Sequence, residues 1–392
     1  MAERAIRERL RELPAEVRPL DQCVGRTLRQ DVYAERDNPP FDRVCMDGIA
    51  VTSAARGQRT FTIEATQPAG APAVRLSIPR NAIEVMTGAV LPLGTDCVIP
   101  VEEYELTAGA VALHDQVVIE PYRNVQRRGS DSRPGVPMLR AGIRLGAPEI
   151  AVVASAGLAS VSVSRQPTLM VISTGDELVD PGKPIADHQV RRSNAYAIVA
   201  ALREHGFDQV GNDHIADDEN TLRDRLARHL NECDVLILSG GVSKGRFDLV
   251  PKVLRDLRVE QVFHQIAQRP GMPMWFGISS EGRAVFGLPG NPVSTLVCLA
   301  RYVIPAILTA MEADPVAPET VGLASGVTRG RTVATFVPVS LRSDGHGGTS
   351  AVPVVPNGSG DFLALAGTAG FVELPPQPDP YPEGFVARLY RW

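Results

Sequence analysis

Lysine is nearly absent from this chain of 392 residues, which has only Lys183, Lys244 and Lys252. With a net charge of -5 at pH 7, the chain also lacks the positive excess of a general nucleic-acid binder. A phosphorylated ligand must then be held by local features such as backbone N–H groups, a few Arg or Lys side chains, and a metal ion. We therefore expect no nucleic-acid partner.

Cysteine pairs and long apolar runs are missing as well. The five cysteines are scattered without a CxxC spacing, which argues against a zinc site or a disulfide framework. No stretch of eighteen apolar residues occurs, so we expect no membrane span. The N-terminus opens with a charged, helical pattern and lacks an apolar signal core. These absences predict a cytoplasmic protein with no membrane partner.

The pattern of apolar residues, Gly and Pro divides the chain into segments of different predicted secondary structure. Apolar residues at Ile6, Leu10 and Leu13 predict one helix, and the spacing over 20–28 predicts a second. Short apolar runs then alternate with Gly and Pro, which is an all-β pattern, before helical character returns at 148–158. We predict a discontinuous helical domain (1–38 and 134–165), an inserted β domain (39–133), an α/β domain (166–312) and a C-terminal β domain (313–392).

Strand and helix patterns alternate in the third of these segments. Ser193 is expected to cap a helix over 194–205, and Asp217 a helix that runs to about Leu230. A long apolar helix is expected from Val293. The alternation predicts a doubly wound α/β domain with a parallel sheet. Its buried strands are predicted at 168–173, 234–239 and 284–288.

Three unusual loops follow these strands, at 173–178, 239–246 and 287–294. The first carries two adjacent carboxylates, and the other two are rich in glycine, which allows backbone N–H groups to form an anion-binding nest. The last loop enters a helix, whose N-terminus also favours an anion. Ligands of open α/β sheets bind at the carboxyl ends of the strands. The sequence therefore predicts an enzyme site for a phosphorylated small molecule.

These loops resemble those of the MoeA family, the molybdopterin molybdenumtransferases related to the C-terminal domain of gephyrin. The family patterns TGDEL, SGGVSxG and GLPGNPVS are matched at 174–178, 239–245 and 287–294. The family's PPFDxSxMDGYA and MTGAPLPxGAD are matched at 39–50 and 86–96, and its RxxGxD around 128–131. The motifs occur in the family's order along the whole chain.

The resemblance implies a MogA-like α/β domain and a homodimer, with the helical domain as its dimerisation domain. It implies Mg²⁺-dependent insertion of molybdate into adenylylated molybdopterin with release of AMP. Partners implied are a MogA-type adenylyltransferase and the molybdoenzymes that accept the cofactor. Both substrates are anionic, and Mg²⁺ prefers carboxylate and phosphate oxygens.

The resemblance also assigns roles to residues. In the family the β-domain residues face the α/β domain of the other subunit, so the site would be shared across the dimer. The catalytic residues implied are Asp47, Thr87, Asp131, Glu177 and Asp248. The metal ligands implied are Asp176, Glu177, Asp217 and Asp248. The substrate-binding residues implied are Gly175, Ser239, Gly240, Gly241, Ser243, Lys244, Arg269, Pro289, Gly290, Asn291 and Ser294.

The chain departs from the family pattern at several charged positions. Where the family has KPGKP, this chain keeps a cation at Arg269 and has Met272 in place of the second lysine. Lys244 and Arg246 are cations where the family has Val and Glu, and Arg192 replaces an Asp. Whether the new cations compensate for Met272 or mark a shifted substrate is open.

Two other functions stay open at this point. One is a MogA-like adenylyltransferase, against which the flanking β domains and the motif at Asp47 argue. The other is a degenerate, non-catalytic molybdopterin-binding scaffold or carrier, which Met272 and Arg246 keep open.

Overall fold

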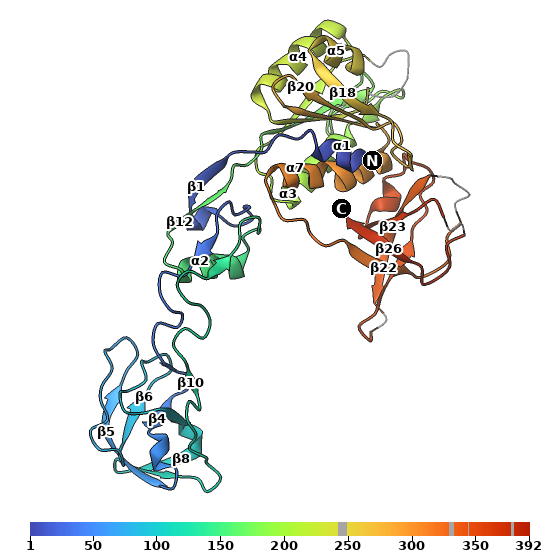
Figure 1. The fold of residues 1–392 in the computed structure, drawn as a ribbon. Coiled ribbons are helices and arrows are strands. Elements are labelled where there is room, and N and C mark those ends of the chain that lie inside the picture. Colours follow the sequence, from blue (N-terminus) through green and yellow to red (C-terminus); the bar gives the residue numbers. More distant parts are fainter. Residues whose placement is uncertain (242–248, 329–332, 344, 378–379) are drawn as a thin grey trace.

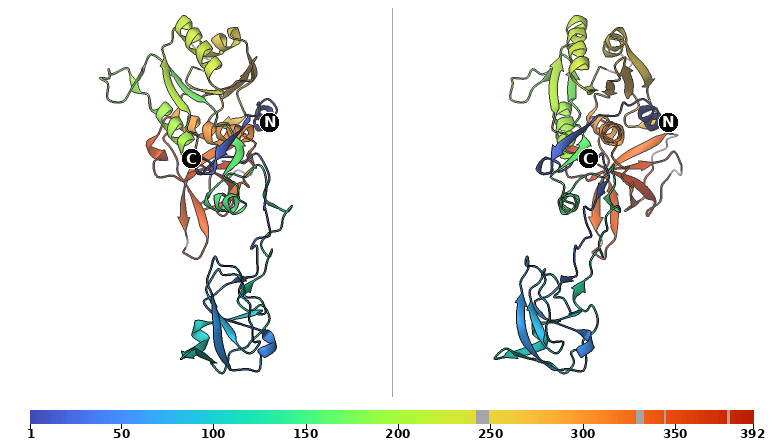
Figure 2. Two further views of the ribbon diagram at one scale, coloured as in Figure 1. Left: turned by 90° about the vertical axis from the view of Figure 1, so that its left-hand side faces the viewer. Right: turned by 60° about the vertical axis from the view of Figure 1, so that its left-hand side comes forward.

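The structure, a computed structural model, describes residues 1–241, 249–328, 333–343, 345–377 and 380–392. The molecule is elongated (Figure 1). The α/β domain and the C-terminal β domain lie together at one end, and the inserted β domain, with β4, β6 and β10, lies at the other. Two extended segments connect the ends, and the separation is visible from all three directions (Figure 2).

A six-stranded sheet forms the centre of the α/β domain, with strand order β16-β13-β17-β21-β20-β18. The first four strands are parallel, and β20 and β18 are antiparallel to their neighbours. In register, Ser173 lies opposite Ser239, and Ser239 lies opposite Leu288, so three strand ends form one row. The bounds are β13 Leu169–Thr174, β16 Val210–Ile215, β17 Val235–Ser239, β18 Val259–His264, β20 Trp275–Ser279 and β21 Ala284–Leu288.

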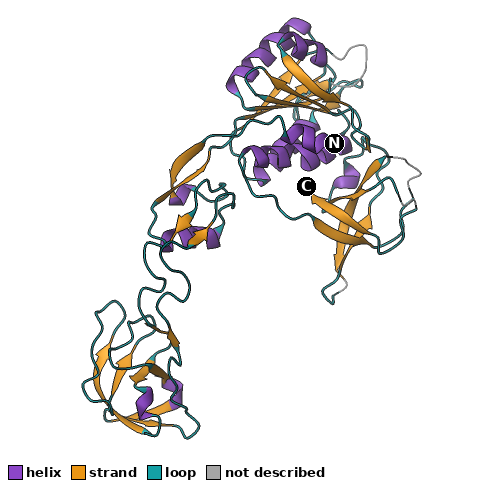
Figure 3. Ribbon diagram, in the orientation of Figure 1, coloured by secondary structure: helices purple, strands orange, loops and turns teal. Residues whose placement is uncertain are grey.

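Helices cover both faces of this sheet, which makes the domain doubly wound as predicted (Figure 3). α6, a π-helical turn and α7 form one continuous apolar helix, Pro292–Ala310. Its mean hydropathy of 1.7 over an 18-residue window would suit a membrane span, yet 67% of that window is buried inside the protein, as in a core helix. The bounds are α3 Ser193–Glu204, α4 Glu219–Glu232, α5 Val250–Asp256, α6 Pro292–Cys298, the π-helix Leu299–Val303 and α7 Ile304–Ala310.

Two predicted helix caps are shifted by one residue. The residue before α3 is Arg192, and Ser193 is already helical. The cap of α4 is Asp218, whose Oδ1 accepts a hydrogen bond from the Thr221 N–H at 2.8 Å, so the prediction of Asp217 is wrong. A cap is defined by which side chain reaches the third helical N–H, and two successive aspartates satisfy the sequence pattern equally well.

The segments that flank the inserted domain pair with each other through short strands and hold one helix. β1 (Ala15–Pro19) pairs with β12 (Ser160–Ser164), and β2 (Val32–Tyr33) pairs with β11 (Pro137–Leu139) beside α2 (Ala147–Ser155). The helix predicted over 20–28 is wrong. Only a 3-10 turn (Leu20–Gln22) forms there, because the following residues leave the helical path at Gly25 (φ +75°) and bridge to the second flank.

The first helix belongs to the α/β core by its packing. α1 is shorter than predicted, Ala2–Arg7, and its Ile6 is buried with Leu13 in the cluster that covers one face of the α/β sheet. The domain boundaries proposed from the sequence stay predictions.

The two β domains differ in whether their main sheet closes into a barrel. The inserted domain has a six-stranded sheet of order β7-β4-β6-β5-β9-β8. In the C-terminal domain β23 pairs with both β24 and β25, which closes the sheet into a barrel. The first domain contains β3 Arg43–Val44, β4 Gly48–Val51, β5 Thr60–Gln67, β6 Ala82–Val85, β7 Cys97–Pro100, β8 Tyr104–Thr107, β9 Ala110–Leu113, β10 Val125–Gln126, and 3-10 turns at Ser53–Ala55 and Val101–Glu103. The second contains β22 Glu319–Leu323, β23 Ala334–Ser343, β24 Thr349–Pro353, β25 Gly370–Leu374, β26 Val386–Arg391 and a 3-10 turn at Leu363–Leu365. The short strand β19 Gln268–Arg269, from the α/β segment of the chain, pairs with β23 in this sheet. The short strands β14 Leu178–Val179 and β15 Val190–Arg191 pair with each other in the α/β region.

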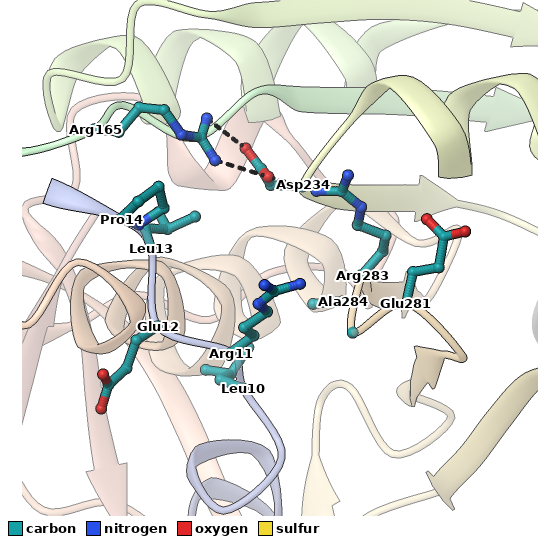
Figure 4. Close-up of a pocket in the computed structure, with 11 residues that line it drawn as sticks. Leu10, Arg11, Glu12, Leu13, Pro14, Arg165, Asp234, Glu281, Arg283 and Ala284 are labelled. Atoms are coloured by element: carbon teal, nitrogen blue, oxygen red, sulfur yellow. Dashed lines mark hydrogen bonds and ion pairs between the residues drawn. The ribbon is translucent and has the colours of Figure 1, made fainter. Parts of the chain in front are cut away.

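A cavity of about 340 Å³ lies at the amino ends of the α/β strands, on the side opposite the loops (Figure 4). Its floor is Asp234, which accepts hydrogen bonds from both Arg165 Nη atoms (2.9 and 3.0 Å), from Arg283 Nη1 (2.7 Å) and from the Thr168 N–H (2.9 Å). This network joins the starts of three strands. The Asp234 carboxylate is thus paired with two arginines of the same domain, which gives this network a structural role.

The Asp234 network predicts a pH-dependent contribution to stability. Burial raises the pKa of Asp234, but the hydrogen bonds from Arg165 and Thr168 and the nearby arginine charges outweigh it, so the net shift is downward. The contribution is therefore complete above the unfolded pKa of about 3.9 and is lost as the pH falls through the lower folded value. We expect Asp234→Asn to reduce the free energy of unfolding at pH 7 by about 2 kcal/mol.

Denaturant unfolding followed by the fluorescence of Trp275, which is buried in the same sheet, measures this effect. The difference from the wild type should shrink below about pH 4. Asp256→Asn is the matched control, since its ion pair with Arg223 is more exposed and should contribute at most about 0.5 kcal/mol. Equal losses in both variants would contradict the prediction.

Candidate active site

The three loops lie against one another at the carboxyl edge of the sheet. A Cβ added to Gly240 would lie 3.0 Å from the Thr174 carbonyl oxygen, and one added to Gly241 would lie 2.6 Å from Thr174 Oγ1. A Cβ on Gly290 would lie 3.8 Å from Gly240 Cα. Gly240 and Gly241 have φ values of +96° and +67°, so glycine is needed there for conformation as well as for space.

A cavity of about 480 Å³ opens between these loops and the start of α3. Asn194 spans it at the base, because its Nδ2 donates to Ser239 Oγ (3.0 Å) and to the Gly290 carbonyl oxygen (2.7 Å). Three polar atoms here, Ser173 Oγ, Thr174 Oγ1 and Asn194 Oδ1, are buried and have no hydrogen-bond partner among the described residues. Such groups are normally satisfied, so a polar ligand in this cavity would complete them.

A second cavity, of about 530 Å³, lies on the other side of the loop at 287–294. Arg269 is the only charged residue in its described lining. Thr335 and Ser359 of the C-terminal domain also line it, and Asn291 lines both cavities. The Asn291 Nδ2 donates to Ser359 Oγ at 2.7 Å, so this contact stands between the two cavities.

Two of the predicted metal ligands on these loops, Asp176 and Asp217, are in contact. Asp176 Oδ1 accepts a hydrogen bond from the Asp217 N–H at 3.1 Å, and Glu177 lines the first cavity. The Gly175 carbonyl oxygen lies 2.9 Å from His214 Nε2, which fixes the loop to the neighbouring strand. Over the described ranges, no group of three or more His, Cys, Asp or Glu side chains is arranged to hold a metal ion. The predicted residues Ser243, Lys244 and Asp248, and Arg246 with them, lie outside the described residues.

The predicted catalytic residues of the inserted domain form their own group. Asp47 Oδ1 accepts hydrogen bonds from the Thr87 N–H (2.6 Å) and the Thr87 hydroxyl (2.8 Å), and these lower the pKa of Asp47. Asp131 is held by Gln126 Nε2, at 2.8 Å from each carboxylate oxygen, and by the Ser130 hydroxyl. The inserted domain is far from the α/β loops within one chain (Figures 1 and 2). A single chain therefore does not bring the two groups of residues together.

Residues that the sequence analysis did not assign to the site one by one also line both cavities. Ser173, Thr174, Asn194 and Arg192 line the first cavity, and Ser359 lines the second. A signal for Ser359 was available, because 356–360 is a further stretch rich in Gly and Ser; no pattern linked it to a loop 68 residues earlier in the chain.

Three family models match successive parts of the chain. The MoeA N-terminal region (domain I and II) matches residues 1–157, a probable molybdopterin binding domain matches residues 170–309, and the MoeA C-terminal region (domain IV) matches residues 320–391.

Relatives match over nearly the whole length. The molybdopterin molybdenumtransferase of Synechocystis sp. is 38% identical over 376 residues, which is 95% of this chain and 94% of that protein. Molybdopterin molybdenumtransferase 2 of Mycobacterium tuberculosis is 32% identical over 388 residues, with 95% and 94% covered. A molybdopterin biosynthesis MoeA protein structure from Pyrococcus horikoshii is 29% identical with a TM-score of 0.78, covering 100% of this chain and 97% of that one.

Proposed function

Because this chain belongs to the MoeA family, we propose that its two adjoining cavities bind the two substrates of a molybdate insertion reaction. The protein is a molybdopterin molybdenumtransferase of molybdenum cofactor biosynthesis, like its curated relatives. The step we propose is the insertion of molybdate into adenylylated molybdopterin with hydrolysis of the adenylyl bond and release of AMP. The observation that carries the proposal is the pair of cavities that share Asn291 at the carboxyl edge of the sheet.

The first cavity fits the nucleotide phosphates of the adenylylated substrate. Its walls are backbone at Gly240 and Gly290, the start of helix α3, and the unpaired hydroxyls of Ser173 and Thr174. Backbone N–H groups and a helix N-terminus hold phosphates without a basic surface, which suits a chain with a net charge of -5.

The second cavity fits molybdate. Arg269 provides one fixed positive charge and a planar set of donors for oxyanion oxygens. Hydroxyls of Ser294, Thr335 and Ser359 surround the same space. Asn291, between the cavities, would then lie where the two substrates meet. Pro289 and Gly290 shape this loop.

The inserted domain supplies the remaining groups in this proposal. The inserted domain, which carries Asp47, Thr87 and Asp131, lies too far from the α/β domain of its own chain for these residues to act there (Figure 1). In a homodimer they would act at the partner's loops. The Asp47 carboxylate is ionised at neutral pH, as a role in orienting water or metal requires, and its hydrogen bonds from Thr87 fix its orientation.

Mg²⁺ fits the donors at the loop edge. Asp176, Glu177 and Asp217 are oxygen donors on neighbouring loops, and two of them are linked by a hydrogen bond. Mg²⁺ typically takes one or two carboxylates together with substrate phosphates, so a preformed cluster of three protein ligands is not required. We propose these residues and Asp248 as its ligands, and the bound ion would neutralise charge on the phosphoanhydride. We also propose that the protein is cytoplasmic. A MogA-type adenylyltransferase would supply its adenylylated molybdopterin, and molybdoenzymes would accept the finished cofactor.

An assay of AMP release from adenylylated molybdopterin tests the proposal. We expect release that requires both molybdate and Mg²⁺ and that yields active cofactor for an apo-molybdoenzyme. Adenylylation of molybdopterin from ATP would instead indicate the adenylyltransferase. Binding of the substrate with no turnover under any condition would indicate a scaffold.

A further inference from the structure

A buried set of hydrogen bonds lies directly behind the turn that carries Arg269. Gln268 is 2% exposed. Its Nε2 donates to the Pro270 carbonyl oxygen at 3.0 Å and contacts Cys298 Sγ at 3.6 Å. Its Oε1 accepts from the Tyr302 hydroxyl at 2.6 Å. The side chain of Gln268 thus joins the turn at 269–271 to the long helix that follows the substrate loop.

The turn is also packed tightly against this layer. Gly271 has φ +98°, and a Cβ on it would lie 2.6 Å from both Cys298 Sγ and Gln268 Nε2. On the other side of the turn, the Met272 carbonyl oxygen accepts a hydrogen bond from the Ile266 N–H at 2.9 Å. The turn is therefore held by backbone pairing, at Met272 and between Gln268–Arg269 and β23, and by the side chains of Gln268 and Cys298, which do not line the substrate cavity.

Tyr302 belongs to the π-helical turn Leu299–Val303 inside the helix Pro292–Ala310. π-helical turns are rare overall, but those that occur are often found at functional sites. The extra residue changes which side chains face a neighbouring element. Here two successive residues have different partners: Arg301 binds Glu373 at 3.2 Å, and Tyr302 binds Gln268. The Tyr302 hydroxyl is the donor of this bond, and burial raises its pKa further above the ordinary value of about 10.

We propose that Gln268 and Tyr302 are positioning residues that set the affinity for molybdate by fixing the turn of Arg269. This rests on the proposed function, in which Arg269 holds molybdate in the second cavity. Neither residue lines the first cavity, so the affinity for adenylylated molybdopterin should not depend on them. The mechanism is indirect: without the tyrosine hydroxyl, Gln268 Oε1 is left buried without its donor, and the amide can rotate away from Pro270.

The test is Tyr302→Phe in the full chain, with the two substrates varied separately. We expect the KM for molybdate to rise about tenfold, because an unsatisfied buried acceptor shifts an equilibrium by about that factor. The KM for adenylylated molybdopterin should stay within about twofold, and kcat at saturating molybdate should be nearly unchanged. Gln268→Met, which cannot hold the Pro270 carbonyl oxygen, should produce the same pattern.

Tyr390→Phe is the matched control. It removes another partly buried phenol beside the same helix, whose hydroxyl binds Glu373 at 2.8 Å, without touching the turn. It should leave both KM values unchanged. Equal effects of Tyr302→Phe and Tyr390→Phe, or parallel increases in both KM values, would show a merely structural role and overturn the inference.

Equilibrium titration with molybdate alone separates this inference from the proposed function. If the wild type does not turn over but binds molybdate, the proposed reaction fails, and weaker binding by Tyr302→Phe still supports the positioning role. If the wild type turns over and both variants bind molybdate as it does, only the positioning role fails. Wild-type protein that binds no molybdate would overturn both.

Discussion

An equal mixture of two inactive variants, Asp47→Asn and Glu177→Gln, is expected to recover about a quarter of the wild-type rate after subunit exchange. Each variant alone should lose about 10²-fold or more, because one removes a group of the inserted domain and the other a group of the α/β loops. If the inserted domain of one chain completes the loops of the other, a mixed dimer has one intact site and one site that lacks both groups. Random exchange makes about half of the dimers mixed, and half of their sites are intact.

A second mixture is the control for this experiment. Asp47→Asn and Asp131→Asn both alter the inserted domain, so every site of a mixed dimer keeps one damaged domain and no activity should return. Molybdate-dependent release of AMP measures both mixtures, and two affinity tags confirm that mixed dimers have formed. Mixed dimers of the first pair that stay inactive would show that the site is not shared, and the long separation in Figure 1 would then need another explanation.

The sequence predicts the α/β strands well because several local signals agree. The runs before the three loops are mainly apolar, and each is followed by a turn that contains glycine. The third strand, Ala284–Leu288, has the predicted bounds. The helix expected over 20–28 fails for the opposite reason. Its spacing is helical, but pairing of Thr27 and Leu28 with the other flank, more than a hundred residues away, outweighs a weak local preference.

The candidate site shows a similar limit. Motif spacing can propose that the loops meet, and it can explain Gly48 after Asp47 only as a turn residue. The structure gives another reason, since a Cβ on Gly48 would lie 2.0 Å from the Ile99 carbonyl oxygen on the neighbouring strand. The contact between Asn291 and Ser359 crosses two domains, and no local pattern encodes it. Nor does a sequence show that the domains of Asp47 and Glu177 lie at opposite ends of the molecule (Figure 1).

The second large effect is expected from one methyl group in the loop after β17. Gly241→Ala places a Cβ 2.6 Å from Thr174 Oγ1 and 2.8 Å from Val250 Cγ2, at a φ of +67°. Either the loop or the Thr174 side chain, which lines the first cavity, must move, so we expect the KM for adenylylated molybdopterin to rise by about tenfold or more. The KM for molybdate should change little, because Gly240 and Gly241, the described residues of this loop's glycine pair, do not line the second cavity.

Gly182→Ala separates displacement of the loop from the cost of a left-handed backbone. Gly182 also has a positive φ, +82°, but a Cβ there meets nothing within 4 Å. Both variants should lose about 1 kcal/mol of stability from the backbone, and thermal unfolding measures that loss. Only Gly241→Ala should raise the KM for adenylylated molybdopterin. If the two variants change its KM equally, then the close approach of the Gly241 loop to Thr174 does not shape the phosphate cavity, and the first cavity is not where the nucleotide binds.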